Sequence, residues 1–322
     1  MFKKSISKYL IAFATLAAAV NANNASKNDC FKVYICKAAE IEALNSVVKG
    51  IQDYLGNDGV QYKIETCQGN PSLALQIVSK FIASQACLIV TVGTTPSQIA
   101  YKFAKEGKIK ALVFTAVTDP LSIASSFNNS NTTGVSDFVS SSPQIETFKK
   151  IQPSLKRLGI IYNTGEANSV ATVKDLRKAT SKHNVELVEQ GVQKSSDIPQ
   201  ALTALLSKNI DAIFINNDNA VLEAAAYIVK ICVKRKIPVY VSDTDEVSKG
   251  CLAALGPNQY ELGRQTGKMI EKIKNGTNIN DIKVERPTDV ELFVNLRAAS
   301  KLGITVPDEV LKNANKITEQ TC

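Results

Sequence analysis

Short apolar runs alternate with amphipathic, helix-like stretches along most of this chain, and the alternation occurs twice. In the first series the apolar runs lie at 31–37, 62–68, 88–93 and 111–117, and the helical patterns cover about 41–56 and begin at Pro71 and Pro96. In the second series the runs lie at 158–163, 185–192, 211–216, 238–243 and 251–256, with helical patterns after Pro143, from Ala167, over 198–208 and from Asn219. Strands that alternate with helices are typical of parallel sheets covered by helices on both faces. The sequence therefore predicts an α/β fold with two Rossmann-like lobes.

Two segments indicate where the chain changes lobe. The stretch 122–143, rich in Ser and Asn, interrupts the alternation and is interpreted as the first passage between lobes. After Gly256 a loop and a helix ending near Gly276 are expected on the first lobe, followed by one more strand and helix on the second. The predicted lobes are 29–140 with 257–283, and 141–256 with 284–322. Three crossing segments would form a hinge, which permits bending but resists free tumbling.

Residues 1–22 have the features of a cleavable secretory signal. Basic Lys3, Lys4 and Lys8 precede an apolar stretch of about a dozen residues that ends in Val20-x-Ala22. We expect cleavage after Ala22 and a periplasmic location. The apolar stretch is too short to span a bilayer comfortably, and Cys30 does not follow it directly, so neither a membrane anchor nor a lipoprotein is expected.

Charge and cysteine content argue against nucleic-acid and metal binding. The net charge of +8 falls to +5 when the lysines of the signal are removed, and the remaining basic residues are spread among acidic ones. A nucleic-acid surface needs clustered basic and aromatic residues. The cysteines show no C-x-x-C spacing and His183 is the only histidine, so neither a metal site nor a cofactor is expected. Cys36 and Cys67 lie near the ends of two predicted neighbouring strands, where they form either a disulfide or two buried free thiols.

Two strand-to-helix junctions share one design in different halves of the chain. LIVTVGTTPSQIA (Leu88–Ala100) and LGIIYNTGEANSV (Leu158–Val170) each change from an apolar run to small hydroxyl- and amide-bearing residues where a helix begins. Such junctions direct backbone N–H groups and side-chain donors into the crevice at the carboxyl ends of a parallel sheet. One junction in each half predicts two lobes that share one ligand.

Several longer strings, together with the second junction, resemble one known family. VFTAVTDPLSIA, TGVSD, IPVYVSDTDEVSKGCLAALG and YELGRQTGKM look like the periplasmic substrate-binding proteins of ABC transporters, in the TrpX-like group, and the resemblance extends from Phe31 to Asp308. It implies a type I periplasmic binding protein fold that closes on a small solute and delivers it to a permease in the inner membrane. It also implies an aromatic amino acid (Trp, Tyr or Phe) as ligand. The family often has a His-Pro pair after the first strand, where this chain has Ala39-Glu40-Ile41-Glu42.

An amino acid in a closed cleft needs partners for its carboxylate and its ammonium group. The carboxylate suits the hydroxyls of Thr94 and Thr95 at a helix N-terminus, although Thr95 could instead cap the helix before Pro96. The ammonium group needs a carboxylate. Asp218 and Asp243 each follow a predicted strand and are the first candidates, and each also suits an N-cap or turn.

Other candidates follow strands in the same way. Glu166, Asn168 and Ser169 would face the two threonines across the cleft, although Asn168 or Ser169 could instead cap the helix that follows. Gln68, after the second strand, would line the same crevice.

Thr118 and Asp119 belong either to the cleft or to the entrance of the hinge. Tyr260 and Arg264 are expected to have a structural role before a ligand-binding one, because they follow the second crossing between the lobes.

The expected function is capture of a solute by a monomer, without catalysis. An enzyme on the same scaffold is one alternative, but the chain has neither a G-x-S-x-G elbow nor a G-x-x-x-x-G-K-[ST] loop, which leaves only a carboxylate-dependent hydrolase. The ligand domain of a sugar-type repressor would carry DNA-binding helices where this chain has its signal. A ligand sensor for a membrane receptor would use the same cleft as a transport protein.

Overall fold

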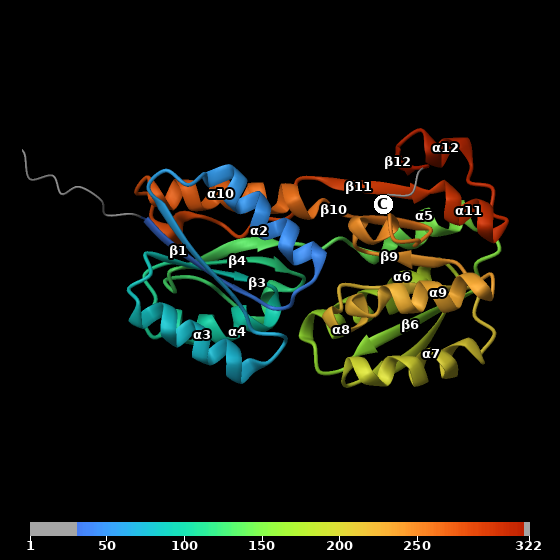
Figure 1. Ribbon diagram of the computed structural model, residues 1–322, viewed down its shortest axis with the longest axis horizontal. Coiled ribbons are helices and arrows are strands. Elements are labelled where there is room, and N and C mark those ends of the chain that lie inside the picture. The colour runs from blue at the N-terminus through green and yellow to red at the C-terminus, as the bar shows by residue number, and fades with distance from the viewer. Residues whose placement is uncertain (1–30, 319–322) are drawn as a thin grey trace, which may run out of the picture.

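The computed structural model describes residues 31–318, which form two α/β lobes lying side by side (Figure 1). The predicted signal at 1–22, and the predicted lobe ends at 29–30 and 319–322, lie outside the described residues. Within residues 31–318, no helix is long and apolar enough to cross a membrane.

Each lobe is built on one sheet. The strands of the first lobe are β1 Phe31–Lys37, β2 Val60–Thr66, β3 Leu88–Val92, β4 Leu112–Val117 and β5 Thr132–Ser136. They form a parallel sheet in the order β2-β1-β3-β4-β5. The strands of the second lobe are β6 Arg157–Asn163, β7 Glu186–Val192, β8 Ala212–Ile215, β9 Val239–Val241, β10 Ala253–Pro257, β11 Val290–Asn295 and β12 Ala314–Ile317. Their order is β12-β11-β10-β9-β8-β6-β7, and β11 runs antiparallel to β10.

Helices cover both faces of each sheet, so each lobe has two apolar cores (Figure 1). The helices of the first lobe are α2 Glu42–Leu55 and α10 Gln259–Lys274 on one face, and α3 Pro71–Ala83 and α4 Thr94–Lys105 on the other. The helices of the second lobe are α5 Ser141–Ile151, α6 Ala167–Lys182, α11 Leu296–Leu302 and α12 Asp308–Leu311 on one face, and α7 Ile198–Leu206, α8 Asn219–Glu223 and α9 Ala225–Lys234 on the other. The predicted α/β class with two lobes is confirmed.

Two local predictions are corrected by the structure. The stretch 122–143, interpreted only as a passage between lobes, contains the edge strand β5. Its sequence TTGVS has no apolar run, and Gly134 is needed where β5 passes β4, because a Cβ there would lie 2.2 Å from the carbonyl oxygen of Phe114. Helix α4 begins at Thr94, two residues before the proline expected to start it.

The chain passes between the two sheets three times, as the predicted hinge requires. The crossings follow β5, follow β10 and precede β11, and they lie together between the lobes (Figure 1). Two of them are hydrogen bonded side by side, since the backbone N–H of Ser136 donates to the carbonyl oxygen of Glu285 over 2.9 Å. The middle crossing is joined to the third where the N–H of Asn258 donates to the carbonyl oxygen of Asp289.

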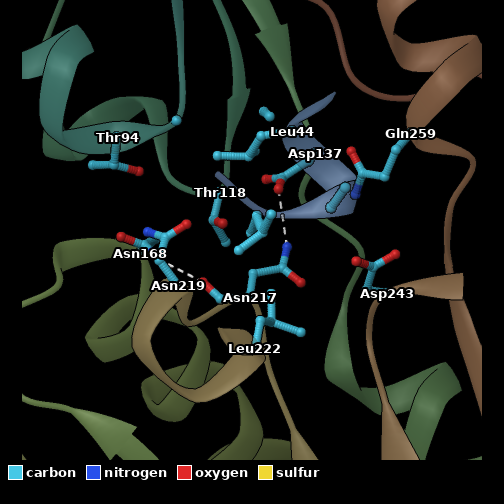
Figure 2. A pocket seen from close by; sticks show the side chains of 14 residues that line it. Leu44, Thr94, Thr118, Asp137, Asn168, Asn217, Asn219, Leu222, Asp243 and Gln259 are labelled. Carbon is cyan, nitrogen blue, oxygen red and sulfur yellow. Dashed lines mark hydrogen bonds between the residues drawn. The ribbon is translucent and has the colours of Figure 1, made fainter. Parts of the chain in front are cut away.

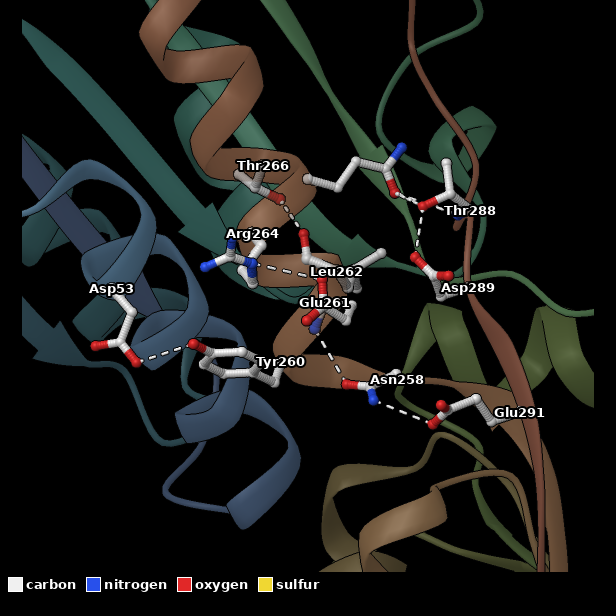
Figure 3. Close-up of polar contacts among 11 residues, drawn as sticks. Asp53, Asn258, Tyr260, Glu261, Leu262, Arg264, Thr266, Thr288, Asp289 and Glu291 are labelled. Atoms are coloured by element: carbon white, nitrogen blue, oxygen red, sulfur yellow. Dashed lines mark hydrogen bonds and ion pairs between the residues drawn. The ribbon is translucent and has the colours of Figure 1, made fainter. Parts of the chain in front are cut away.

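Helix α10 returns from the second lobe and packs against α2 (Figure 3). Asn258 caps it by accepting from the N–H of Glu261 and also donates to Glu291 in β11 over 3.0 Å. The Tyr260 hydroxyl donates to Asp53 in α2, and the Arg264 guanidinium lies over the ring of Tyr54, also in α2. Tyr260 and Arg264 therefore join the two helices.

All the cysteines described by the structure are free thiols. Cys36 in β1 and Cys67 just after β2 are both fully buried, and the Cys67 side chain together with burial raises the pKa of Cys36. Of the two alternatives for this pair, the structure has the buried free thiols.

Replacement of Gly263 by Ala should destabilise the first lobe. A Cβ at Gly263 would lie 2.1 Å from the carbonyl oxygen of Val47, so the α2 and α10 backbones must move apart. We expect a loss of about 1–3 kcal/mol in the free energy of unfolding, measured by chemical denaturation. Gly165→Ala is the matched control, because Gly165 is exposed and its Cβ would approach only one side-chain oxygen, at 3.3 Å. Equal stability of the two variants would contradict this account of the packing.

Candidate binding cleft between the lobes

The lobes enclose a small cavity at the carboxyl ends of both sheets (Figure 2). It measures about 30 Å³, which holds little more than a water molecule. A ligand as large as an amino acid therefore needs the lobes to open for its entry and to close around it less tightly than they do here. The cavity is lined by Ile41, Ala43, Leu44, Gly93, Thr94, Ala116, Thr118, Asp137, Asn168, Asn217, Asn219, Leu222, Asp243 and Gln259.

Polar contacts across the cleft show that the lobes are closed. The Asn217 amide, after β8, donates over 2.9 Å to Asp137, which follows β5 on the first lobe. Lys249 on the second lobe forms an ion pair of 2.8 Å with Glu42 at the start of α2. This ion pair is exposed and contributes little to the free energy of closure.

The first-lobe wall is formed where β3 turns into α4. Gly93 has φ +95°, and a Cβ there would lie 2.7 Å from the Cβ of Ala38, so only glycine fits this turn. The turn places Thr94 in the cavity wall with its hydroxyl buried and without a partner. Thr95 lies beside it and does not line the cavity.

Glu166 organises the second-lobe wall. Its Oε2 accepts from the side-chain amides of Asn168 and Asn219 over 3.2 and 2.7 Å, and from the N–H of Asn219. Its Oε1 accepts from the N–H of Ala220. The Asn168 amide nitrogen also donates to the carbonyl oxygen of Asn217, so only its side-chain oxygen is left for a ligand, whereas Asn219 has its oxygen and one N–H left.

Asp218 and Ser169 lie behind this wall and hold the junctions together. The Asp218 carboxylate accepts from the N–H of Asn163, from the Ser169 hydroxyl over 2.6 Å and from the N–H of Val221 over 3.0 Å. Both residues are fully buried, and neither lines the cavity. Asp218 therefore caps α8 and fixes the turn after β6.

The cavity wall holds buried polar atoms that have no hydrogen-bond partner in the protein. They are the Thr94 hydroxyl, Asp137 Oδ1, Asp243 Oδ2 and Gln259 Oε1. A buried polar atom without a partner costs about 1–3 kcal/mol, so such atoms are uncommon unless a ligand pairs with them. One hydroxyl together with three acceptors is a set that matches a ligand carrying both an anionic and a cationic group.

The carboxyl groups of the cleft have raised pKa values because they are buried. Burial raises the pKa of Asp243 to about 8, and the neighbouring carboxylates of Asp245 and Glu246 add to the rise. Burial raises the pKa of Asp137 to about 6, against the effect of its hydrogen bonds from Thr118 and Asn217.

The structure brings part of the predicted set of site residues together. Thr94, Thr118, Asn168 and Asp243 line the cavity, whereas Glu166, Ser169 and Asp218 support its second-lobe wall. The remaining three predicted residues lie outside it. Gln68 is exposed in the turn after β2, Thr95 is half-buried and not part of the lining, and Asp119 caps the short 3-10 turn at Pro120–Ser122.

Several lining residues were not predicted from the sequence. Asp137 ends the string TGVSD, and Asn217 and Asn219 flank Asp218, so their positions after strands were a usable signal. Gln259 begins α10 just after the second crossing, and no local pattern distinguishes it from an ordinary first-turn residue.

Comparisons with known proteins agree with this architecture. Residues 32–318 match the family described as ABC transporter substrate binding protein. A tyrosine-binding protein of Clostridioides difficile (strain R20291) is 31% identical over 260 residues, which cover 79% of this chain and 74% of that protein. The ABC domain in complex with L-Trp from Streptococcus pneumoniae has a TM-score of 0.83 at 27% identity, covering 89% of this chain and 99% of that one. The ligand-free, open structure of a substrate-binding protein with adhesive properties from Clostridium difficile has a TM-score of 0.67 at 30% identity, covering 89% and 98%.

Two α/β lobes with mostly parallel sheets, closed around a cleft at the carboxyl ends of their strands, define a type I solute-binding protein. The chain belongs to the ABC transporter substrate-binding protein family, and the predicted resemblance is confirmed. Its greater likeness to the L-Trp complex than to the open, ligand-free relative agrees with the contacts that close the cleft.

The ligand-free protein should lose stability as the pH rises from 5 to 8.5. The folded-state pKa values of Asp137, Asp218 and Asp243 are raised to about 6, 6 and 8, so the protonated groups favour the folded state, and this contribution is lost as the pH passes through those values. We expect the free energy of unfolding to fall by about 1–3 kcal/mol across this range, measured by denaturation at each pH. Asp243→Asn should flatten the upper part of the profile. A stability that is constant or rises between pH 5 and 8.5 would contradict the assignment.

Proposed function

We propose that this protein captures an aromatic amino acid (Trp, Tyr or Phe) in its cleft and delivers it to an ABC permease in the inner membrane. It acts as a monomer in the periplasm, after cleavage of the signal at 1–22. The observation that carries the proposal is the set of buried, unpartnered polar atoms around the cavity. The tyrosine-binding and L-Trp-bound relatives support the choice of ligand class.

The cavity offers separate partners for the two charges of an amino acid. The ligand carboxylate binds the Thr94 hydroxyl at the N-terminus of α4, where free backbone N–H groups and the helix dipole favour an anion. The ammonium group binds an acceptor on the crossing segments, where Asp137 has an unpartnered oxygen. Leu44 from the first lobe and Leu222 from the second supply apolar contacts for the side chain.

Transport requires the ligand to favour closure. A ligand shifts the equilibrium between open and closed lobes only by its difference in affinity for the two states. Thr94 and Leu44 belong to the first lobe, and Asn168 and Leu222 to the second, so a ligand that contacts both walls binds the closed state more tightly. The permease then recognises the closed protein.

Titration with amino acids should give micromolar or tighter affinity for at least one of Trp, Tyr and Phe, on the scale where 1 μM corresponds to about 8 kcal/mol. The chain has no tryptophan, so the emission of bound Trp is free of protein indole fluorescence. Calorimetry with all twenty amino acids and mass spectrometry of co-purified ligand extend the measurement. An absence of binding heat for every amino acid would contradict the proposal.

Thr94→Val should weaken binding of the aromatic amino acid identified by titration by about 10- to 100-fold, because the ligand carboxylate loses a charged hydrogen bond in a buried site. Thr95→Val is the matched control, since the neighbouring hydroxyl does not line the cavity. Isothermal titration of both variants measures the difference. Equal losses, or a greater loss for Thr95→Val, would contradict this carboxylate site.

A further inference from the structure

The cavity has unpartnered buried acceptors on three different side chains. Among the described residues that line it, none is basic and none is aromatic, whereas two are carboxylic acids. Asp137, Asp243 and Gln259 each present an unpartnered oxygen. A ligand ammonium group carries three N–H donors, so the positions of these three acceptors decide which of them it meets and which are left for the ligand side chain.

The arrangement of these groups separates the two ends of the cavity. In Figure 2, Thr94 and Asn168 lie on one side, Gln259 and Asp243 lie on the opposite side, and Asp137 lies between them. A carboxylate held at Thr94 with its neighbouring ammonium group at Asp137 directs the ligand side chain toward Asp243 and Gln259. Leu44 and Leu222 are drawn above and below this path, from opposite lobes.

Asp243 is also the less suitable partner for an ammonium group. Its Oδ1 accepts from the N–H of Asp245 over 3.1 Å, and its Oδ2 faces the cavity unpaired. Burial and the carboxylates of Asp245 and Glu246 raise its pKa to about 8, while Lys249 opposes the rise. A carboxyl group whose charged form is disfavoured by burial attracts a cation less than an exposed carboxylate does, and in either protonation state its Oδ2 keeps a lone pair that accepts from a phenol O–H or an indole N–H.

We propose that Asp243, together with Gln259, selects ligands whose side chain carries a hydrogen-bond donor, so that the cleft accepts tyrosine or tryptophan and discriminates against phenylalanine. This inference rests on the proposed amino-acid function and narrows its ligand class. Phenylalanine would fill the same apolar space but leave two buried acceptors unpaired. A site built to bond a donor rejects the analogue that lacks it far more strongly than a purely apolar pocket can.

The test is a double-mutant cycle with one change on the protein and one on the ligand. The protein change is Asp243→Asn, and the ligand change is loss of the side-chain hydrogen-bond donor. Wild-type protein and Asp243→Asn are each titrated with L-tyrosine, L-tryptophan and L-phenylalanine by calorimetry at pH 7. The N–H of Asp245 holds a carbonyl oxygen at Oδ1, so the Asn variant turns an amide NH₂ toward the ligand where the wild type has an acceptor. Asp119→Asn is the control, because Asp119 caps the short turn at Pro120–Ser122 and does not line the cavity.

We expect the wild type to bind tyrosine or tryptophan at least about tenfold more tightly than phenylalanine. Asp243→Asn should remove most of this preference by weakening the binding of tyrosine and tryptophan and leaving that of phenylalanine unchanged, whereas Asp119→Asn should keep the preference. The inference is overturned if the wild type binds phenylalanine as tightly as tyrosine and tryptophan. It is also overturned if Asp243→Asn weakens the binding of all three ligands equally. In both cases amino-acid binding itself stands. An absence of binding by any amino acid overturns the proposed function as well.

Discussion

Closing two lobes over carboxyl groups removes water from groups that the protein does not fully pair. Asp137 Oδ1 and Asp243 Oδ2 are both buried in the wall of the same cavity without a donor. Each such atom costs about 1–3 kcal/mol, which opposes closure of the empty cleft. A ligand that supplies donors removes this cost only in the closed state. The same atoms therefore determine both the preference for closure on ligand and the chemistry of the ligand that closes it.

A cleft that buries unpaired polar atoms requires rigid walls. Residues that lie behind the lining of the cavity hold these walls in place. Glu166 fixes the amides of Asn168 and Asn219, and Asp218 ties the turn after β6 to α8. Neither acid is available to a ligand in this arrangement, although both follow strands as ligand-binding residues do. Both carboxylates accept hydrogen bonds from groups of the protein, so the lining side chains are held in place before a ligand arrives.

The sequence predicted the elements that local chemistry determines. Apolar runs such as LIVTV in β3 and LGIIYN in β6 stand out because both faces of these strands are buried. The strand β5 was missed because TTGVS is polar and is stabilised at the sheet edge by the crossing segment at Glu285. Thr94, Asn168 and Asp243 could be found because each follows a strand. Gln259 could not, since its role depends on how the lobes meet, which no local pattern records.

The hydrogen bond of Asn217 to Asp137 contributes only a small free energy to closure of the lobes. Its side chain joins Asp137 on the first lobe to Ser242 on the second, so opening breaks the bond to Asp137. Water replaces the lost bond on both partners, and the net contribution of such a bond to closure is only about 1 kcal/mol. Opening also hydrates Asp137 Oδ1 and Asp243 Oδ2, which favours the open state by a comparable or larger amount. These polar terms together favour the open state, and the donors that a ligand brings into the cleft shift the balance toward closure.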